Sequence, residues 1–355
     1  MPGTATSRGR IPSLDGLRAV SILLVLLAHL RGTRGFPASL SGPLPFELGA
    51  LGVRVFFVIS GFLITSLLIG ERTKTGAISL PRFYLRRTLR IFPPYYVYVV
   101  VVIALEWAGR LSLHPGDIVH SLTYTVNYHR DRAWWLGHAW SLSVEEQFYL
   151  LWPAVFLLGG TVRALRTIVV FLAAAPVWRL VLAWLVPTAR LSIGETFFTT
   201  ADAIAAGCLL ALARPRLHAS ALYVSMLRSK AVALLPVAIL LANASGRWAR
   251  LYWLAGMTLE SLLVMVLIDR ATTDAESAVG RLLNARPLVV FGTWSYSTYL
   301  WQQMFLNRNG ESVINAFPLN LGLAIAAAAC SYYVIEQPSL RFRENLESRL
   351  FPRGA

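Results

Sequence analysis

Charged residues are scarce in this sequence, and their scarcity decides the class of protein. Only 14% of the 355 residues are charged while 56% are hydrophobic, whereas an average soluble domain carries about 25% charged residues. This composition excludes an ordinary soluble core and indicates a chain that crosses a bilayer several times.

Cysteine and the common catalytic motifs are nearly absent as well. The two cysteines, Cys208 and Cys330, both lie in apolar runs, so we interpret them as packing residues. The sequence contains no P-loop, GxGxxG, CxxC or HExxH motif. Its six histidines show no metal-ligand spacing, and we therefore expect no metal site.

Apolar windows of about 20 residues recur along the chain, each long enough to cross a hydrocarbon layer of about 30 Å. We expect an all-α integral membrane protein with about ten transmembrane helices. We also expect one domain over 1–355, with no appended soluble domain, and allow for a short re-entrant or interfacial helix in 109–140. The ten windows are approximately 13–31, 51–70, 90–108, 141–159, 165–186, 197–213, 230–245, 251–269, 286–306 and 318–337.

The distribution of Lys and Arg predicts how these helices are oriented. If the N-terminus is cytoplasmic, 21 of the 33 fall in cytoplasmic segments, 9 in the opposite loops and 3 within or at the edge of spans. The positive-inside rule then places both termini in the cytoplasm of a cell-membrane (inner or plasma membrane) protein. The same bias explains most of the net charge of +15 without a nucleic-acid partner.

Two ionisable residues interrupt the first window. Arg18 and His29 are eleven residues apart, which is about 16 Å along a helix and nearly the same face. Asp15 can pair with Arg18 by i,i+3 spacing, whereas His29 has no such local partner. Ionisable residues at membrane depth are costly and indicate function, although a snorkelling side chain or a structural ion pair is the alternative.

Carboxylates are expected at the same outer depth as His29. Glu145 and Glu146 begin the fourth window and Asp202 begins the sixth, and both windows enter from the outer side. A carboxylate beside an imidazole fixes its tautomer and raises its basicity, so we predict that one of these acids orients His29. Satisfying the helix dipole is the alternative role for these acids. His138 lies just ahead of this cluster.

A basic cluster precedes the third window on the cytoplasmic side. Arg86 and Arg90 are i,i+4 on one helix face, which suits binding of phosphate groups. A membrane anchor or an anionic-lipid contact is the alternative. The full cluster consists of Arg82, Arg86, Arg87 and Arg90.

Seven motifs in order resemble the acyltransferase-3 family of multi-pass membrane acyltransferases, which includes O-antigen and exopolysaccharide acetylases and macrolide acyltransferases. The resemblance covers nearly the whole chain. The motifs are "LDGLRAVSILLVLLAHL", "GVRVFFVISGFLIT", "FYLRRTLRIFPPYY", "WSLSVEEQFYLLWP", "DAIAAGCLLA", "SYSTYLWQQ" and "YYVIEQPSLRF".

The resemblance implies transfer of an acyl group from acyl-coenzyme A to a hydroxyl, usually on a sugar. The acyl group is expected to be acetyl, and the acceptor a cell-surface glycan such as a lipopolysaccharide or exopolysaccharide. His29 matches the family histidine, Arg18 the first-span arginine, Arg86 and Arg90 the arginine pair, and Glu145 the family carboxylate. His29, oriented by Glu145, would then act as general base on the acceptor hydroxyl. The alternative is that His29 attacks the thioester itself and forms an acyl-histidine intermediate.

The sequence departs from the family pattern in the later motifs. Gln302 stands where the family often has histidine, and Thr200 stands where an arginine often precedes Asp202. Ser60 lacks the glycine of a nucleophile elbow, and its neighbour Gly61 favours close helix packing. The candidates for the acceptor side are Asp202, Ser60, Trp140 and Gln302.

Three other functions remain open from the sequence. A carrier or flippase for a lipid-linked glycan would use the same buried charges as a translocation path. Acylation of a macrolide-type small molecule is a second alternative, and a coenzyme-binding sensor without catalysis is a third. The tryptophans near the outer side fit either sugar stacking or the interfacial belt.

Overall fold

The computed structural model describes residues 11–42 and 46–351, and no described residue lies in a β-strand. The longer helices are α1 (Pro12–Leu30), α3 (Leu48–Thr75), α4 (Leu80–Trp107), α7 (Ala139–Leu185), α9 (Asp202–Ala219), α13 (Met257–Thr273), α17 (Leu319–Ser331) and α18 (Gln337–Leu350). The shorter α-helices are α2 (Ala38–Ser41), α5 (Asp117–Leu122), α6 (Trp134–Gly137), α8 (Phe197–Thr200), α10 (Ala221–Arg228), α11 (Leu235–Ala244), α12 (Ala249–Leu251), α14 (Ala278–Leu283), α15 (Arg286–Thr293) and α16 (Ser295–Phe305).

The remaining elements are short turns of other helix types. Two of them, η5 (Tyr252–Gly256) and η7 (Tyr332–Glu336), are π-helical and lead into α13 and α18. The 3-10 turns are η1 (Val126–Tyr128), η2 (Pro187–Ser192), η3 (Lys230–Leu234), η4 (Ser245–Arg247) and η6 (Val313–Asn315).

The structure confirms an all-α membrane protein, although its helices divide differently from the ten predicted windows. Within the described part of the chain, seven helical segments are long and apolar enough to span a bilayer. The windows 197–213 and 286–306 fall short of this standard. α9 carries three charged residues, Asp202, Arg214 and Arg216, in its 18 residues. The window 286–306 is divided between α15, with 8 residues, and α16, with 11 residues. Each of these helices is shorter than a crossing requires.

The longest segment is divided at Gly160. Trp134–Leu185 counts as one apolar segment of 52 residues, but Gly160 has non-helical angles (φ 63°, ψ −174°) that break α7. A positive φ is accessible to glycine at little cost. The break separates the predicted windows 141–159 and 165–186. The stretch 109–140 contains the short α5, η1 and α6, as the sequence analysis allowed.

The centre of the bundle is formed by helices whose backbones approach closely at glycines. In α3, Gly61 faces the carbonyl of Ile204, and in α9, Gly207 faces the carbonyl of Val58. A Cβ at either glycine would collide with backbone atoms, which is the small-residue packing typical of membrane helices. This tight contact fixes α3, which carries Ser60, against α9, which carries Asp202.

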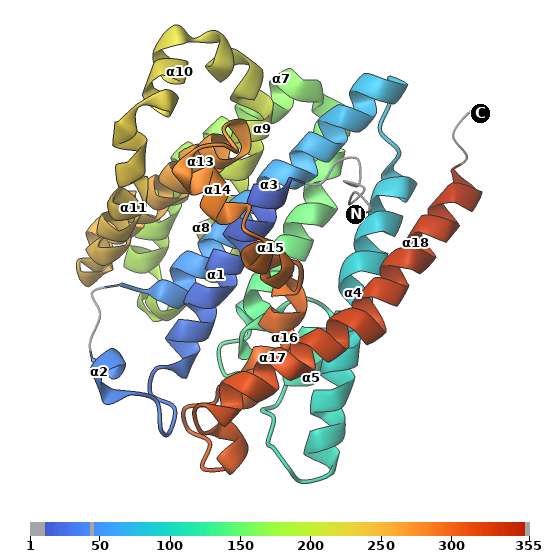
Figure 1. The fold of residues 1–355 in the computed structure, drawn as a ribbon, viewed down its shortest axis with the longest axis vertical. Helices are drawn as coiled ribbons and strands as arrows, with labels where there is room; N and C mark the ends of the chain where they lie inside the picture. Colours follow the sequence, from blue (N-terminus) through green and yellow to red (C-terminus); the bar gives the residue numbers. More distant parts are fainter. Residues whose placement is uncertain (1–10, 43–45, 352–355) are drawn as a thin grey trace.

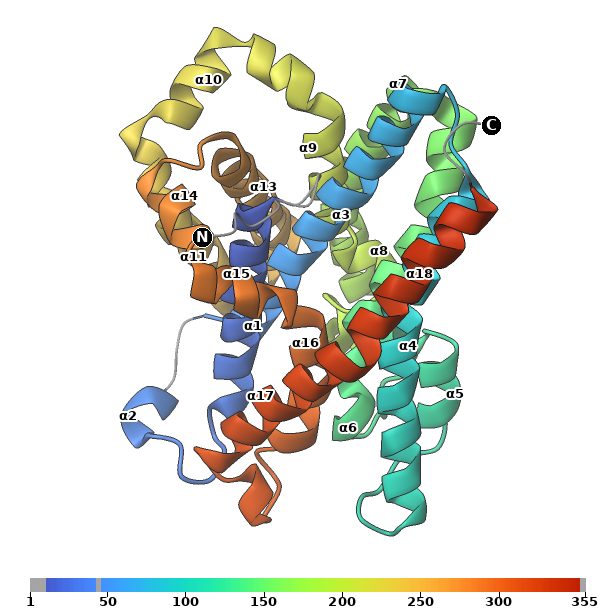
Figure 2. The ribbon, with the colours of Figure 1, turned by 45° about the vertical axis from the view of Figure 1, so that its right-hand side comes forward.

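The two ends of the molecule carry different segments. In Figures 1 and 2, α10, α14 and the link from α3 to α4 lie in the upper half, whereas α2 and α5 lie in the lower half. The charge distribution assigns the first set to the cytoplasm and the second to the outside. The structure therefore separates the two sets in space, and the direction in which they face the membrane stays a prediction.

Candidate active site

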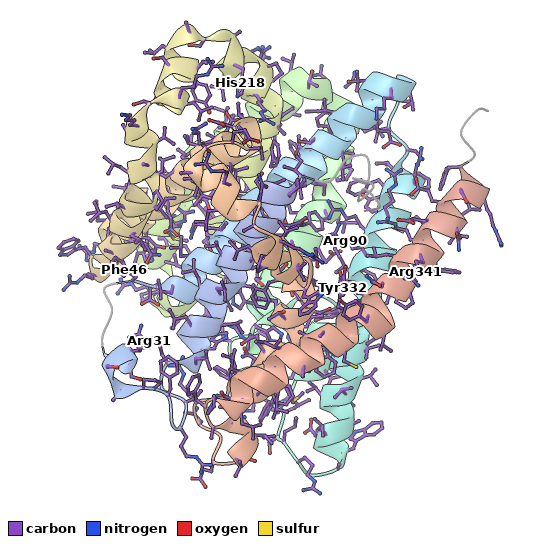
Figure 3. All side chains as sticks on the ribbon, in the orientation of Figure 1. Arg31, Phe46, Arg90, His218, Tyr332 and Arg341 are labelled. Atoms are coloured by element: carbon purple, nitrogen blue, oxygen red, sulfur yellow. The ribbon has the colours of Figure 1, made fainter. Side chains whose placement is uncertain are left out.

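Three adjoining cavities run through the described part of the bundle, and their shared lining residues place them in series. The basic cavity, about 1000 Å³, shares Arg18, Ser60 and Arg90 with the central cavity, about 340 Å³. The central cavity shares Val53 and Tyr299 with the outer cavity, about 400 Å³. In Figure 3, Arg90 and Tyr332, which line the central cavity, lie near the middle of the molecule, with His218 toward one end and Arg31 toward the other.

The basic cavity brings together the arginine cluster predicted from the sequence. Ser79 caps α4 by accepting a hydrogen bond from the Arg82 backbone N–H at 3.4 Å, so the arginines occupy the first turns of this helix. Six arginines line the cavity against three carboxylates, giving an excess of positive charge. The arginines are Arg18, Arg82, Arg86, Arg87, Arg90 and Arg343.

Two arginines of the cluster are already paired with α18. Glu347 accepts hydrogen bonds from Arg82 Nε and Arg86 Nε, both at 2.8 Å. Arg87 instead stacks over the ring of Tyr149, 4.5 Å from its centroid. The carboxylate of Glu347 therefore occupies a position where two guanidinium groups could bind a phosphate.

The central cavity contains Glu145, which pairs with a serine. Ser60 Oγ donates to Glu145 Oε1 at 2.5 Å, joining α3 to α7. Arg18 lines the same cavity and pairs with Asp15 at 3.2 Å, which confirms the expected i,i+3 contact. These groups make a polar passage between the basic cavity and the outer cavity.

The outer cavity contains His29 at the end of α1. Its imidazole packs edge-on against Trp134, with centroids 5.4 Å apart. Trp134 is itself fixed, because its Nε1 donates to the Gln303 carbonyl at 2.8 Å and its carbonyl accepts from Gln303 Nε2 at 2.7 Å. Trp140 and His138 complete this part of the lining.

The partner of His29 fixes its tautomer. Nδ1 of His29 lies 2.7 Å from Gln302 Oε1, while the amide nitrogen of Gln302 donates to the Tyr299 carbonyl at 3.5 Å and to Gln303 Oε1 at 3.1 Å. A carbonyl can only accept, so the amide nitrogen must face Tyr299 and the oxygen must face His29. His29 therefore carries its proton on Nδ1 and keeps a lone pair on Nε2.

This arrangement corrects the prediction that Glu145 orients His29. The two residues line different cavities, Glu145 the central one and His29 the outer one, and the polar partner of His29 is Gln302. Ser60 was placed on the acceptor side, but it lines the basic and central cavities. Gln302 accepts a hydrogen bond from Nδ1 of His29, and Trp140 is the acceptor-side candidate that lines the outer cavity together with His29.

Asp202 also lies away from His29. Its carboxylate pairs with Arg179 at 2.5 Å and with Arg54 at 3.7 Å, and Arg54 in turn lies 3.6 Å from Glu260. All four side chains are nearly inaccessible to solvent, and the network joins α3, α7, α9 and α13. Arg54 and Arg179, from other helices, thus pair with Asp202 although the motif has threonine at position 200. This buried network of charges connects the four helices to one another.

Several residues of the site were missed by the sequence analysis. Gln303 holds Trp134 beside His29, Tyr299 lines both the central and the outer cavity, and Glu347 lines the basic cavity. Glu260 carried a usable signal, because a carboxylate inside an apolar run predicts a buried partner. The other residues are common at membrane interfaces or helix ends and carried no such signal. No group of three or more potential metal ligands occurs among residues 11–42 and 46–351.

The fold and the cavities define a multi-pass cell-membrane protein whose interior leads from an arginine-rich cavity to a histidine with a free lone pair. The chain belongs to the acyltransferase domain family, whose model matches residues 11–336. This confirms the resemblance drawn from the seven motifs.

Several curated relatives of the chain are named as O-acetyltransferases. The chain is 29% identical to peptidoglycan O-acetyltransferase OatA of Listeria monocytogenes, over 96% of this chain and 56% of that protein. It is 29% identical to O-acetyltransferase OatA of Staphylococcus aureus, over 92% and 57%, and 27% identical to a putative O-acetyltransferase of Staphylococcus aureus strain COL, again over 92% and 57%. The chain thus spans little more than half the length of these relatives. No solved structure matches the chain.

Proposed function

We propose that this chain is a membrane O-acyltransferase that moves an acetyl group from acetyl-coenzyme A to a hydroxyl of a cell-surface glycan, and that His29 is its general base. Peptidoglycan, which the name of the Listeria relative specifies, is the first acceptor to test. We also propose that the chain forms a single transmembrane domain, as the sequence predicted.

The observation that carries the proposal is the series of three cavities. Shared residues join the arginine-rich cavity to the central cavity, and Val53 and Tyr299 join the central cavity to that of His29. A donor with an anionic end and a reactive end held apart on a narrow arm fits this path. Coenzyme A has phosphates at one end and the thioester at the other.

The basic cavity would hold the phosphates. Arginine binds phosphate oxygens through paired N–H donors, and Arg86 and Arg90 lie one turn apart on α4. Arg82 and Arg87 would support them, with Glu347 leaving Arg82 and Arg86 as the phosphate arrives. Arg18, Ser60 and Glu145 would then contact the polar groups of the arm as it passes through the central cavity.

The chemical step would take place at Nε2 of His29. The acceptor hydroxyl gives its proton to Nε2, its oxygen bonds to the thioester carbon, and the C–S bond breaks. The departing thiolate then takes the proton back from His29, so that the enzyme returns to its starting state. A positioned base of this kind contributes about 10²–10⁴ in rate.

The outer cavity suits a sugar acceptor. Trp134 and Trp140 offer aromatic faces, and Arg132 pairs with Glu195 across the lining at 2.7 Å. A sugar has apolar ring faces and polar hydroxyl edges, and a pocket with a few placed polar groups among aromatic side chains recognises both. The acceptor would enter from the side opposite the arginines.

Thioester turnover tests the proposal. Purified protein in detergent receives acetyl-coenzyme A with soluble peptidoglycan fragments, exopolysaccharide oligosaccharides or a macrolide, and free thiol is measured. We expect acceptor-dependent thiol release by the wild type, its loss in His29→Ala, and unchanged release in His114→Ala, a matched control in the outer loop where His114 pairs with Asp131.

Each other result has a definite meaning. Full activity of His29→Ala would exclude His29 as the base. Tight coenzyme binding without turnover for any acceptor would favour a sensor, and absence of both binding and turnover would favour a carrier.

A further inference from the structure

The outer cavity contains a second histidine. His138 lies between α6 and α7 and lines the same cavity as His29. The residue is only 4% exposed, and it shares the cavity lining with His29. Two imidazoles from distant parts of the chain therefore meet in one small space.

The ring of His138 is unusual because it is buried without a hydrogen bond. Neither Nδ1 nor Nε2 forms a hydrogen bond of ordinary distance and angle with a described residue, although the ring approaches the Leu300 backbone. The backbone carbonyl of His138, by contrast, accepts from Tyr299 Oη at 3.0 Å and from Ser141 Oγ at 3.2 Å. The backbone is satisfied while the side chain is not.

Packing alone does not explain a histidine at this position. The ring lies edge-on to Tyr98 and tilted against Tyr299, with both centroids at 5.4 Å. A phenylalanine would fill this aromatic site without burying unpaired polar atoms, which cost free energy. The ring nitrogens of His138 thus lack a well-formed partner within the described chain, and both are covered by neighbouring atoms at the edge of the cavity that the residue lines.

We propose that His138 is a second reaction-site residue, whose neutral ring donates an N–H hydrogen bond to the carbonyl oxygen of the acyl group as that oxygen becomes negative. The inference deepens the proposed function and depends on it. His29 takes the proton of the acceptor hydroxyl, and the new O–C bond moves the carbonyl electrons onto the oxygen that faces His138. When the C–S bond breaks, the carbonyl reforms and the thiolate takes the proton from His29.

The rings of His29 and His138 have different surroundings, which suit different roles. His29 has a fixed acceptor at Nδ1 in Gln302, which suits a ring that gains a proton at Nε2. His138 has no such acceptor, and a second positive charge beside protonated His29 would be repelled. His138 therefore stays neutral, and either tautomer of a neutral imidazole carries one N–H.

Two substitutions test this role in the full-length protein. His138→Phe keeps the aromatic packing and removes the donor, and we expect kcat to fall about 10²–10³-fold, as for loss of one oxyanion donor. His138→Gln keeps an N–H of similar reach and should recover a large part of that loss. Binding of coenzyme A and the melting temperature should match the wild type in both variants.

The outcomes separate this inference from the proposed function. A wild type without thioester turnover overturns the proposed function, and this inference with it. An active wild type with an unimpaired His138→Phe overturns the inference alone. So does an equal loss of kcat in both variants, or a fall in melting temperature that accompanies the loss, since either would assign His138 a structural role.

Discussion

At the scale of single residues, the chemical state of His29 depends on Gln302. The amide of Gln302 is held by the Tyr299 carbonyl and Gln303, so its oxygen faces Nδ1 of His29. A base oriented by a neutral amide differs from one oriented by a carboxylate, because no negative charge balances the proton it gains. The neutral partner fixes the orientation of the ring without placing a charge beside it.

Replacing Gln302 tests this orientation. Gln302→Leu removes the acceptor at Nδ1 and should lower kcat about tenfold, because losing one hydrogen bond of about 1–1.5 kcal/mol raises the barrier by that amount. Gln302→Glu keeps an oxygen at the same reach and should lose less. Steady-state rates of thiol release measure both variants, and equal losses in the two would contradict the orienting role.

Single residues also show where sequence reasoning reaches its limit. The pairing of Arg18 with Asp15 and the grouping of Arg82, Arg86, Arg87 and Arg90 follow from spacing along one helix, and both are present. The contact between His29 and Glu145 was inferred from equal depth in two helices and is wrong. Depth follows from position along the chain, but the face that a side chain presents to a neighbouring helix depends on tertiary packing.

At the scale of secondary-structure elements, α18 has a defined relation to the basic cavity. Figure 2 shows it lying along α4, and Glu347 near its end binds Arg82 and Arg86. The carboxylate holds the two arginines in place and also competes with any phosphate for them. Donor binding should therefore displace the end of α18.

Glu347→Gln tests this competition. Removal of the negative charge should tighten coenzyme A binding, because the phosphate no longer competes with the Glu347 carboxylate for Arg82 and Arg86. Dephospho-coenzyme A, which lacks the 3′-phosphate, should gain less. Glu311→Gln in the loop before η6 is a matched control, and calorimetry measures the affinities. Weaker binding by Glu347→Gln would show that the carboxylate organises the site instead of competing for it.

The contact between α3 and α9 is the second feature at this scale. Gly207→Val should lower thermal stability by about 1–3 kcal/mol or prevent folding, because its side chain would collide with the backbone of Val58. Gly322→Val in α17 is the matched control, since Gly322 faces open space. Melting temperatures in detergent measure the difference. Equal stability of the two variants would contradict close packing at Gly207.

Most helices were predictable from the sequence, as was the break near Gly160, but the π-helical turns were not. Apolar windows located the helices because a bilayer demands about 20 apolar residues in a row. The π-helical turns η5 and η7 leave no clear mark in the sequence, since most of their residues are aromatic or aliphatic. These irregular segments are set by neighbouring helices.

At the scale of the whole molecule, the three cavities form one route through the bundle. Composition and motifs predicted a membrane protein of the acyltransferase family, and the family match confirms this membership. The order of the cavities could not be predicted, because each is lined by helices far apart in sequence. The large exposed apolar side chains on the outside, such as Trp107, Leu158 and Trp184, face the surrounding lipid.

A bulky residue at the junction of two cavities tests the route. Val53 lines both the central and the outer cavity, so Val53→Trp should block the acyl group from reaching His29 while coenzyme A still binds. Val100→Trp on the exposed face of α4 is the matched control, since Val100 is 62% exposed. We expect thiol release to fall at least tenfold only in the first variant. Unchanged turnover in Val53→Trp would place the route elsewhere.

The central claim is that donor and acceptor reach His29 from opposite sides of the membrane. The most direct measurement uses sealed vesicles with the protein in a known orientation, acetyl-coenzyme A on one side and a soluble peptidoglycan fragment on the other. We predict acetylated fragment only when the donor is on the arginine side and the acceptor is on the side where α1 ends. Equal transfer with both substrates on the arginine side would contradict the account.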